Sequence, residues 1–246
     1  MDSTETDSGR FHTRSREPLP TADARQLFDT AWLLEQGLVT HQSHSGRGTT
    51  AVFRYAGQSL VLRPYRRGGA VRHLSATKFI WTGLNRSRPW QEFDLLLAMR
   101  QLGLPCPNPF ACQVVRHGLC YTGSLIMEEI AQAESLAQTL CQREISASEW
   151  SAVGRCIRHF HDASVYHSDL NANNILLDIC GKIHLIDFDK SRFRSGQGNA
   201  WKLANLERLQ RSILKCRMQA DQFFYDPAQW SLLTAGYQED PANDSR

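Results

Sequence analysis

The chain has 246 residues, of which 41% are hydrophobic and 22% charged, and its formal net charge is +3. These values are typical of a soluble globular protein, and the length is enough for one large domain or two lobes that share a cleft. A purely structural peptide is not expected, and no apolar run approaches the roughly 18 residues of a membrane-spanning helix.

Residues 1–20 are too polar to pack and lack the order of charged and apolar residues of a secretory signal, so we expect a flexible tail and a cytoplasmic protein. The seven cysteines form an odd set without a C-x-x-C pair. This pattern argues against a disulfide framework and a zinc site. We expect reduced, mostly buried thiols.

The first half of the chain predicts a β-rich unit over residues 21–130. Residues 49–63 contain two β-rich runs around Ala56-Gly57, which indicate a hairpin. A helical pattern starts at Trp90 and ends near Gly103. Short β-branched runs then continue to Ile130 and predict further antiparallel strands.

The second half, residues 131–246, predicts a helical unit. Ser148 can cap a helix whose apolar stripe is Trp150, Val153, Ile157 and Phe160. A small hairpin is expected around Cys180-Gly181, and a long helix over 199–218. The last ten residues look frayed. The fold class is therefore α+β, with an antiparallel β-rich part first and an α-helical part second.

Residues 166–178, YHSDLNANNILLD, have the form H-x-D-L-x-x-x-N of a kinase catalytic loop. In such a loop the acid, here Asp169, orients the attacking hydroxyl and can take its proton, while the amide, here Asn174, binds magnesium. His167 is better suited to anchoring the loop by hydrogen bonds than to acting as a base, because Asp169 already occupies the position that faces the acceptor.

Phosphoryl transfer also needs a second carboxylate on the metal, and Asp187 in LIDFD supplies it 18 residues after Asp169. Each motif alone is weak, but the two in this order are specific. The alternative is an Asx-rich turn in which the asparagines only cap loops and Asp187 pairs with an arginine. Upstream, Gly46 and Gly48 precede a strand and suit a loop over phosphates, although such glycines are often simple turn residues.

With these motifs the chain resembles the protein-kinase-like superfamily. Within it, the chain is most similar to the bacterial lipopolysaccharide-core kinases that act on 3-deoxy-D-manno-octulosonic acid (Kdo). The resemblance rests on GRGTTAVF, LVLRPYRRGG, WTGLNRSRPWQEFDLL, LGLPCPNP, YHSDLNANNILLD and IHLIDFDKSR. It implies a bilobal kinase-like fold with an N-lobe at 21–130 and a C-lobe at 131–246. It also implies ATP and Mg²⁺, with Asp169 as the catalytic acid/base and Asn174 and Asp187 as magnesium ligands.

The resemblance further assigns Gly46 and Gly48 to the phosphate loop and places the contacts to adenine near Met127. The usual lysine is missing, and Arg63 stands in its place with Glu92 as the expected partner. Arginine keeps the charge but has a broad planar fork, so the phosphate geometry must differ or the partner lies elsewhere. Without the family context, Glu92 is as well explained as a surface carboxylate of a helix.

The acceptor is expected to be small or lipid-linked, because only about ten residues follow the Asp187 loop before the next helical pattern and no A-P-E motif occurs. The resemblance implies transfer of the γ-phosphoryl group of ATP to the 4-hydroxyl of 3-deoxy-D-manno-octulosonic acid (Kdo) on a lipid A precursor. Other kinases of this architecture, acting on heptose, an aminoglycoside or a protein, and a nucleotide-binding pseudokinase are the alternatives.

Arginines are concentrated in residues 63–72 and 85–90, where they can meet an anionic acceptor or form a solvated basic face. The acceptor-binding candidates are Arg66, Arg67, Arg72, Arg86 and Arg88. They also suggest peripheral attachment to the cytoplasmic face of the inner membrane. Nucleic acid is not expected as a partner, because neither basic stretch interleaves aromatic residues or continues as a long helix.

Overall fold

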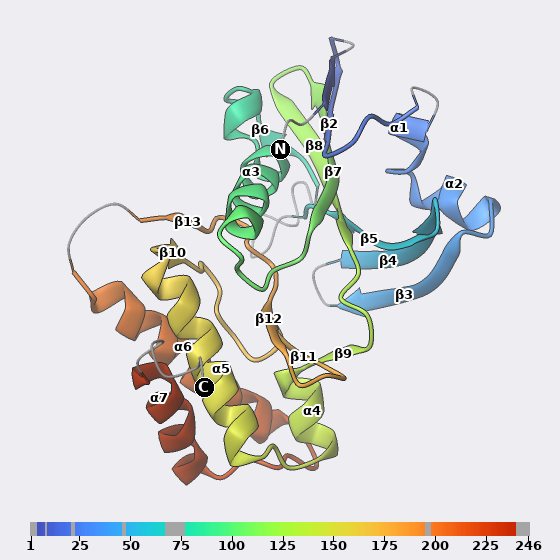
Figure 1. The fold of residues 1–246 in the computed structure, drawn as a ribbon. Helices are drawn as coiled ribbons and strands as arrows, with labels where there is room; N and C mark the ends of the chain where they lie inside the picture. Colours follow the sequence, from blue (N-terminus) through green and yellow to red (C-terminus); the bar gives the residue numbers. More distant parts are fainter. Residues whose placement is uncertain are drawn as a thin grey trace. The chain divides into compact units, whose positions relative to one another are not determined.

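A computed structural model describes residues 4–7, 9–20, 23–45, 48–66, 77–194 and 198–239. The chain divides into two compact units, one of residues 1–97 and 107–129 and the other of residues 98–106 and 130–246 (Figure 1). The first unit holds the large antiparallel sheet and the second holds most of the helices. The α+β class is confirmed.

The sheet of the first unit has the strand order β1-β2-β7-β8-β5-β4-β3, and β6 also pairs with β8. All of these pairings are antiparallel. The strands are β1 (Thr4–Asp7), β2 (Phe11–Ser15), β3 (Val39–Ser45), β4 (Gly48–Tyr55), β5 (Gln58–Pro64), β6 (Phe79–Ile80), β7 (Pro109–His117) and β8 (Cys120–Glu128).

The hairpin of β4 and β5 turns at Ala56 and Gly57, as the sequence predicts. Both residues have positive φ, 48° and 78°, which is the backbone of a type I′ turn and matches the twist of the strands. Alternate residues of these strands, Phe53, Leu60 and Leu62, are fully buried. They pack with Leu27 and Leu33, so the apolar alternation of the strands makes one face of the sheet the core.

The helices of the first unit are short except for one. They are α1 (Asp23–Gln26), α2 (Thr30–Glu35), the 3₁₀ turn η2 (Leu84–Arg86) and α3 (Arg88–Gln101), of which the last crosses the boundary between the units. Asp29 caps α2 by accepting from the backbone N–H of Ala31 at 2.9 Å. The expected helix after Trp90 is confirmed, but the sequence did not predict α1 and α2.

The expectation of a loose tail at residues 1–20 is wrong for residues 4–7 and 11–15. Strand β2 pairs with β7 along five positions, from Phe11 opposite Val115 to Ser15 opposite Ala111. Thr13 and Ser15 are buried. The partner strand supplies the hydrogen bonds that a polar segment cannot provide for itself, so composition alone underestimated its order.

The second unit combines helices with short strand pairs. Its helices are α4 (Leu136–Gln142), α5 (Ala147–Asp162), α6 (Ala200–Gln219), the 3₁₀ turn η3 (Pro227–Gln229) and α7 (Trp230–Gln238). Its strands are β9 (Ala133–Ser135), β10 (Val165–Tyr166), β11 (Ile175–Asp178), β12 (Ile183–Leu185) and β13 (Arg192–Phe193). The β11–β12 hairpin around Cys180-Gly181 is confirmed.

Helix α5 is the centre of this unit. Its predicted apolar stripe is buried, and Phe160 stacks on Phe188 with ring centroids 5.6 Å apart. It also lies directly against α7, because a Cβ on Gly154 would stand 2.0 Å from the Leu233 carbonyl oxygen and a Cβ on Gly236 would stand 2.2 Å from that of Ser151. The two glycines therefore set the spacing of this helix pair.

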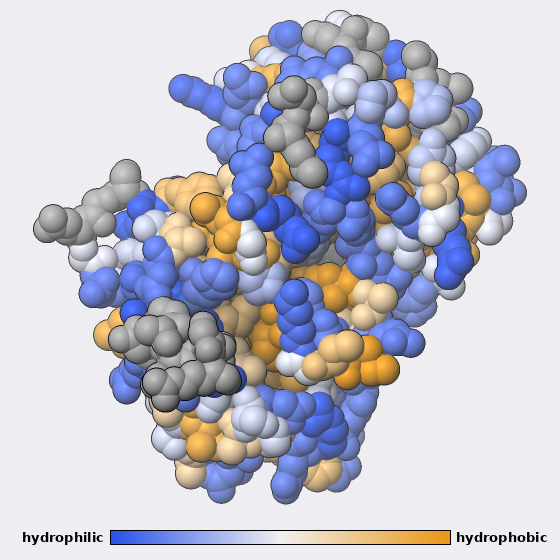
Figure 2. All heavy atoms as spheres, viewed as in Figure 1, coloured by the Kyte–Doolittle hydropathy of each residue, from blue (hydrophilic) through white to orange (hydrophobic). Residues whose placement is uncertain are grey.

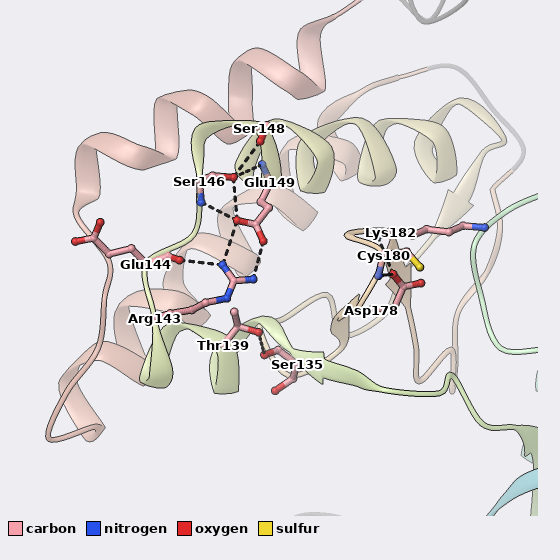
Figure 3. A network of polar contacts seen from close by, with 10 residues as sticks. All are labelled: Ser135, Thr139, Arg143, Glu144, Ser146, Ser148, Glu149, Asp178, Cys180 and Lys182. Carbon is pink, nitrogen blue, oxygen red and sulfur yellow. Dashed lines mark hydrogen bonds and ion pairs between the residues drawn. The ribbon is translucent and has the colours of Figure 1, made fainter.

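The N-terminal cap of α5 is Ser146, not Ser148 as expected from the sequence. Ser146 Oγ accepts from the Glu149 backbone N–H at 3.2 Å, and Glu149 Oε2 accepts from the Ser146 N–H at 2.8 Å (Figure 3). This is a capping box. The Arg143 guanidinium, 2.6 Å from Glu149, lowers the pKa of that carboxyl to about 2.

Polar residues cover most of the face drawn in Figure 2, with apolar residues in scattered patches. All seven cysteines are free, as predicted. Cys106, Cys112 and Cys156 are buried, whereas Cys141 and Cys180 are exposed, so the expectation of mostly buried thiols is only partly right. No helix in the described part of the chain is both long and apolar enough to cross a bilayer.

Candidate active site

The catalytic-loop sequence connects β10 to β11 in the second unit and is anchored by His167. Its Nε2 donates to the Ile186 carbonyl at 2.9 Å, and its Nδ1 accepts from the Asp169 backbone N–H at 3.1 Å. Because Nδ1 accepts, the ring is the neutral Nε2–H tautomer, and burial lowers its pKa. This is the anchoring geometry expected for His167, and it fixes Asp169 relative to the segment before Asp187.

Asn174 connects the same two segments. Its side-chain Nδ2 donates to the Asp169 carbonyl at 2.9 Å, and its own backbone carbonyl accepts from the Ile186 N–H at 3.0 Å. Asp169, Asn174 and the residue before Asp187 are therefore held together by direct hydrogen bonds. Because Nδ2 is used within the loop, the amide oxygen is the side-chain atom of Asn174 that can serve a ligand.

Asp187 follows β12 in a backbone turn of unusual conformation. Its φ is 62°, in the left-handed region that non-glycine residues rarely adopt. The next residue, Phe188, is buried and its ring centroid lies 4.8 Å from that of His167. A buried aromatic ring on one side and the hydrogen-bonded Ile186 on the other hold the strained residue in place, as is common at functional sites.

Helix α6 supplies three polar contacts to the loop that the sequence did not predict. Asn205 Nδ2 donates to the His167 carbonyl at 3.0 Å, and Ser212 Oγ accepts from the Ala172 N–H at 3.1 Å. Between them, Arg208 Nη1 donates to Asp169 Oδ1 at 3.0 Å. Residues 205, 208 and 212 lie on one face of the helix. This row of polar side chains in a predicted amphipathic helix was the one sequence signal that could have indicated a contact with the loop.

A second layer supports Asn205. His161 Nε2 lies 3.4 Å from Asn205 Oδ1, and His161 Nδ1 lies 2.8 Å from the Tyr237 hydroxyl. Burial lowers the pKa of His161 to about 4, so the ring is neutral at pH 7. The loop is thus connected through α6 to α5 and α7.

In the first unit, the expected pair of Arg63 and Glu92 is present. Arg63 Nη2 lies 2.5 Å from Glu92 Oε2, and Glu92 is buried, so it is not a surface carboxylate. Tyr65, which the sequence did not single out, donates its hydroxyl proton to the same Glu92 oxygen and accepts from Arg63 Nη2 at 3.1 Å. Burial, reinforced by the Glu92 charge, raises the pKa of Tyr65 well above its usual value.

The other nucleotide-binding candidates belong to β4 and β8. Gly48 opens β4 opposite Ser45, and Gly46 lies outside the described residues. Met127 is buried on β8 opposite Val61. Their roles in nucleotide binding stay predictions.

The candidate arginines for the acceptor are not equivalent. Arg66 and Arg86 are exposed, whereas Arg67 and Arg72 lie outside the described residues. Arg88 is half-buried, with its guanidinium carbon 4.8 Å from the centroid of Phe79 and 5.5 Å from that of Tyr65. Burial lowers its pKa. Arg88 therefore also packs against aromatic rings, beyond the anion contact that the sequence predicts.

The donor set fits a magnesium ion that shares its ligands with a nucleotide. The described residues contain no group of three or more His, Cys, Asp or Glu side chains that could enclose a metal. Magnesium bound with ATP needs only one or two protein oxygens, because phosphates and waters supply the others. The neutral oxygen of Asn174, next to the Asp187 segment, matches that requirement.

Comparison with known proteins identifies the family. Residues 30–237 match the model of the "Lipopolysaccharide kinase (Kdo/WaaP) family". The chain belongs to this family. It is therefore an ATP-dependent kinase, and the alternative of a pseudokinase is not favoured.

Similar proteins agree with this assignment. A 3-deoxy-D-manno-octulosonic acid kinase of Photobacterium profundum is 38% identical over 216 residues, which cover 88% of this chain and 90% of the relative. A kinase of the same name from Vibrio cholerae is 42% identical over 70% of this chain and 73% of its own length. Another from Xylella fastidiosa is 40% identical over 78% of this chain and 75% of its own.

Proposed function

We propose that the protein transfers the γ-phosphoryl group of ATP to the 4-hydroxyl of Kdo on a lipid A precursor, in lipopolysaccharide core biosynthesis. The observation that carries this proposal is the loop in which Asp169 and Asn174 are joined to each other and to the segment before Asp187. It supports a phosphotransferase site, and the names of the relatives supply the acceptor.

Asp169 is the group that orients the acceptor hydroxyl and takes its proton as the phosphoryl group is transferred. The Asn174 amide oxygen and the Asp187 carboxylate hold Mg²⁺, which, when bound with ATP, neutralises charge on the phosphates. His167 keeps the loop in place and exchanges no proton, because its neutral ring is buried and both nitrogens are used by backbone groups.

Arg208 joins this set as a cation beside the acid. Its guanidinium carries several donors, of which Nη1 contacts Asp169. A phosphoryl group that is transferred to the acceptor hydroxyl beside Asp169 must come close to the Arg208 guanidinium. Arginine supplied in this way stabilises the charge that develops in phosphoryl transfer.

The remaining nucleotide-binding roles are those that the resemblance implies for residues of the first unit. In this proposal Gly46 and Gly48 cover the phosphates, Arg63 contacts them while Glu92 holds it, and Met127 lies near adenine. Acceptor anions meet the arginines Arg66, Arg67, Arg72, Arg86 and Arg88. The enzyme works as a peripheral protein on the cytoplasmic face of the inner membrane and has no nucleic-acid partner.

The test is transfer of radiolabelled phosphate from ATP to a Kdo-bearing lipid A precursor, with heptose, free sugars and generic proteins as competing acceptors. We expect label on the Kdo lipid alone, and a loss of at least about a hundredfold in Asp169→Ala with ATP binding largely retained. Preferential labelling of another acceptor would overturn the assignment of the Kdo lipid as the substrate. Equal loss of turnover and ATP binding in Asp169→Ala would overturn the role of the acid.

A further inference from the structure

Helix α6 has an exposed face beside the one that supports the catalytic loop. Its buried residues are Asn205, Leu206, Leu209 and Ile213. On the outer side, three large apolar residues face solvent: Leu203 is 58% exposed, Leu214 38% and Met218 86%. Single exposed apolar residues are ordinary, but these three lie on one helix.

Helical geometry places them in one row along the helix. At about 100° per residue, Leu203, Leu214 and Met218 fall within about 60° of one another around the axis. The neighbouring sector, toward the loop, carries Arg211, Lys215 and then Arg208. Glu207 and Gln210 lie in the same sector between Leu203 and Leu214, so this row of about 22 Å is apolar at its two ends. It runs beside a cationic row whose edge contacts Asp169.

The charge of the helix is one-sided. Between Ala200 and Gln219 it has the cations Lys202, Arg208, Arg211, Lys215 and Arg217, and its one acid is Glu207. Glu207 lies 3.8 Å from Arg211, and both side chains are largely exposed, so this pair is weak. Lys202 lies 3.7 Å from Asp162 of α5, but on the exposed side Arg208, Arg211 and Lys215 outnumber Glu207, so this face has a net positive charge next to apolar side chains.

We propose that this face of α6 docks on an anionic lipid surface and so presents a lipid-linked acceptor to Asp169. The chemistry of the face fits such a surface, since aliphatic side chains enter the acyl boundary while lysine and arginine meet anionic headgroups. A protein partner would satisfy the apolar ends of the row but would need its own acidic stripe. The inference rests on the proposed function for the identity of the acceptor, but not for lipid binding itself.

The α6 variant combines Arg211→Gln, Lys215→Gln and Met218→Ser and leaves Arg208 unchanged. A matched control exists in the first unit, where Lys78, Arg116 and Leu119 are exposed, Leu119 to 85%. The control variant is Lys78→Gln/Arg116→Gln/Leu119→Ser, which makes the same changes of charge and polarity. Thermal unfolding confirms that both full-length variants are folded.

Binding is measured by sedimentation with vesicles of phosphatidylcholine and phosphatidylglycerol, and with phosphatidylcholine alone. We expect the unaltered protein to prefer the anionic vesicles. Removal of two cations near an anionic surface weakens binding on the order of 30-fold, so the α6 variant should lose most of its binding and the control little. Equal binding by the α6 variant and the unaltered protein, or a larger loss in the control, would overturn the proposal.

Turnover separates this inference from the proposed function. The α6 variant should keep its activity on a water-soluble Kdo acceptor and lose activity on the same sugar carried by a lipid in vesicles. Equal losses on both acceptors would show that the face acts in the reaction and not in docking. If neither acceptor is phosphorylated by the unaltered protein, the proposed function fails, while the sedimentation result still decides whether α6 binds lipid.

Discussion

Two arginine–carboxylate pairs, one in each unit, differ in their access to solvent. Arg63 and Glu92 are 2.5 Å apart, and their side chains are 20% and 1% exposed. Arg208 and Asp169 are 3.0 Å apart, with side chains 47% and 30% exposed. The first pair also includes the Tyr65 hydroxyl, whereas the second lies at the surface of its helix.

Solvent access determines what each pair can do. Breaking a buried pair leaves a charge without water or a partner, so the buried carboxylate is held permanently and acts on stability. An exposed pair contributes little to stability, since water replaces either partner. Such a pair can open and exchange its partner for a ligand. We therefore expect substitutions at Arg208 to affect turnover, and substitutions at Glu92 to affect folding.

The largest effect on turnover is expected for Arg208→Gln. Loss of the cation beside Asp169 should lower kcat about 10²- to 10³-fold. The free energy of unfolding in urea should change by less than about 1 kcal/mol. Arg211→Gln, one turn away on the same helix, is the matched control and should leave turnover on a soluble acceptor unchanged. Arg208→Lys should recover part of kcat, because it keeps the charge and loses the fork. If Arg208→Gln lowered the free energy of unfolding and left kcat unchanged, the exposed pair would act on stability and not on turnover, which contradicts this expectation.

Glu92→Ala should destabilise the protein by about 3–5 kcal/mol, because it leaves Arg63 and Tyr65 without their shared acceptor. Urea unfolding at neutral pH measures this loss. Asp94→Ala is the control on the same helix, since Asp94 pairs with Arg14 at 2.5 Å but its side chain is 50% exposed. A loss of about 1 kcal/mol or less is expected there. Similar losses in both variants would contradict the distinction between buried and exposed pairs.

The stability of the second unit should depend on pH through His161, whose partner Asn205 supports the catalytic loop. Its pKa in the folded protein is about 4, below the ordinary 6.5, so the unfolded chain binds the proton first as the pH falls. The contribution of His161 to the free energy of unfolding is therefore fully present above about pH 6.5. It is lost as the pH falls from there to about pH 4, and the total loss is about 3 kcal/mol. Unfolding free energies across this range should fall less steeply in His161→Gln. Parallel pH profiles would show that this ring is not the cause.

The smallest effect is expected for Tyr65→Phe, which removes one hydroxyl from the buried pair and should cost about 1–2 kcal/mol. Tyr225→Phe is its control. The Tyr225 hydroxyl is buried and has no hydrogen-bond partner among the residues that the structure describes, so its removal should leave the urea midpoint unchanged or raise it. An equal loss of unfolding free energy in Tyr225→Phe and Tyr65→Phe would show that the hydrogen bond from Tyr65 to Glu92 does not stabilise the protein.

The sequence predicted those features that depend on local patterns. The Ala56-Gly57 hairpin, the stripe of α5 and the Cys180-Gly181 hairpin follow from turn chemistry and periodicity, and the structure confirms them. It also paired Arg63 with Glu92, through the family motif. Strand β2 was missed, because a polar segment is ordered there by a partner strand about a hundred residues away.

The candidate site was predicted less completely than the fold. Its acid, amide and second acid stand in motifs of fixed spacing, so they could be named from the sequence. Arg208, Asn205 and Tyr65 were not, because each acts on a residue distant along the chain and none lies in a motif. Ser146 replaced Ser148 as the cap of α5 because helix ends shift by one or two residues without changing the pattern.

The left-handed backbone of Asp187 sets a conflict between folding and function. Glycine adopts a φ near 62° without a steric penalty, whereas aspartate is held there against its preference. Asp187→Gly would remove this backbone penalty, but it would also remove the carboxylate proposed to bind the nucleotide's metal and the interactions that this carboxylate makes in the folded protein. A strained backbone that is kept by an aspartate, where glycine would fit without strain, is what is expected when the carboxylate is retained for function at a cost in stability.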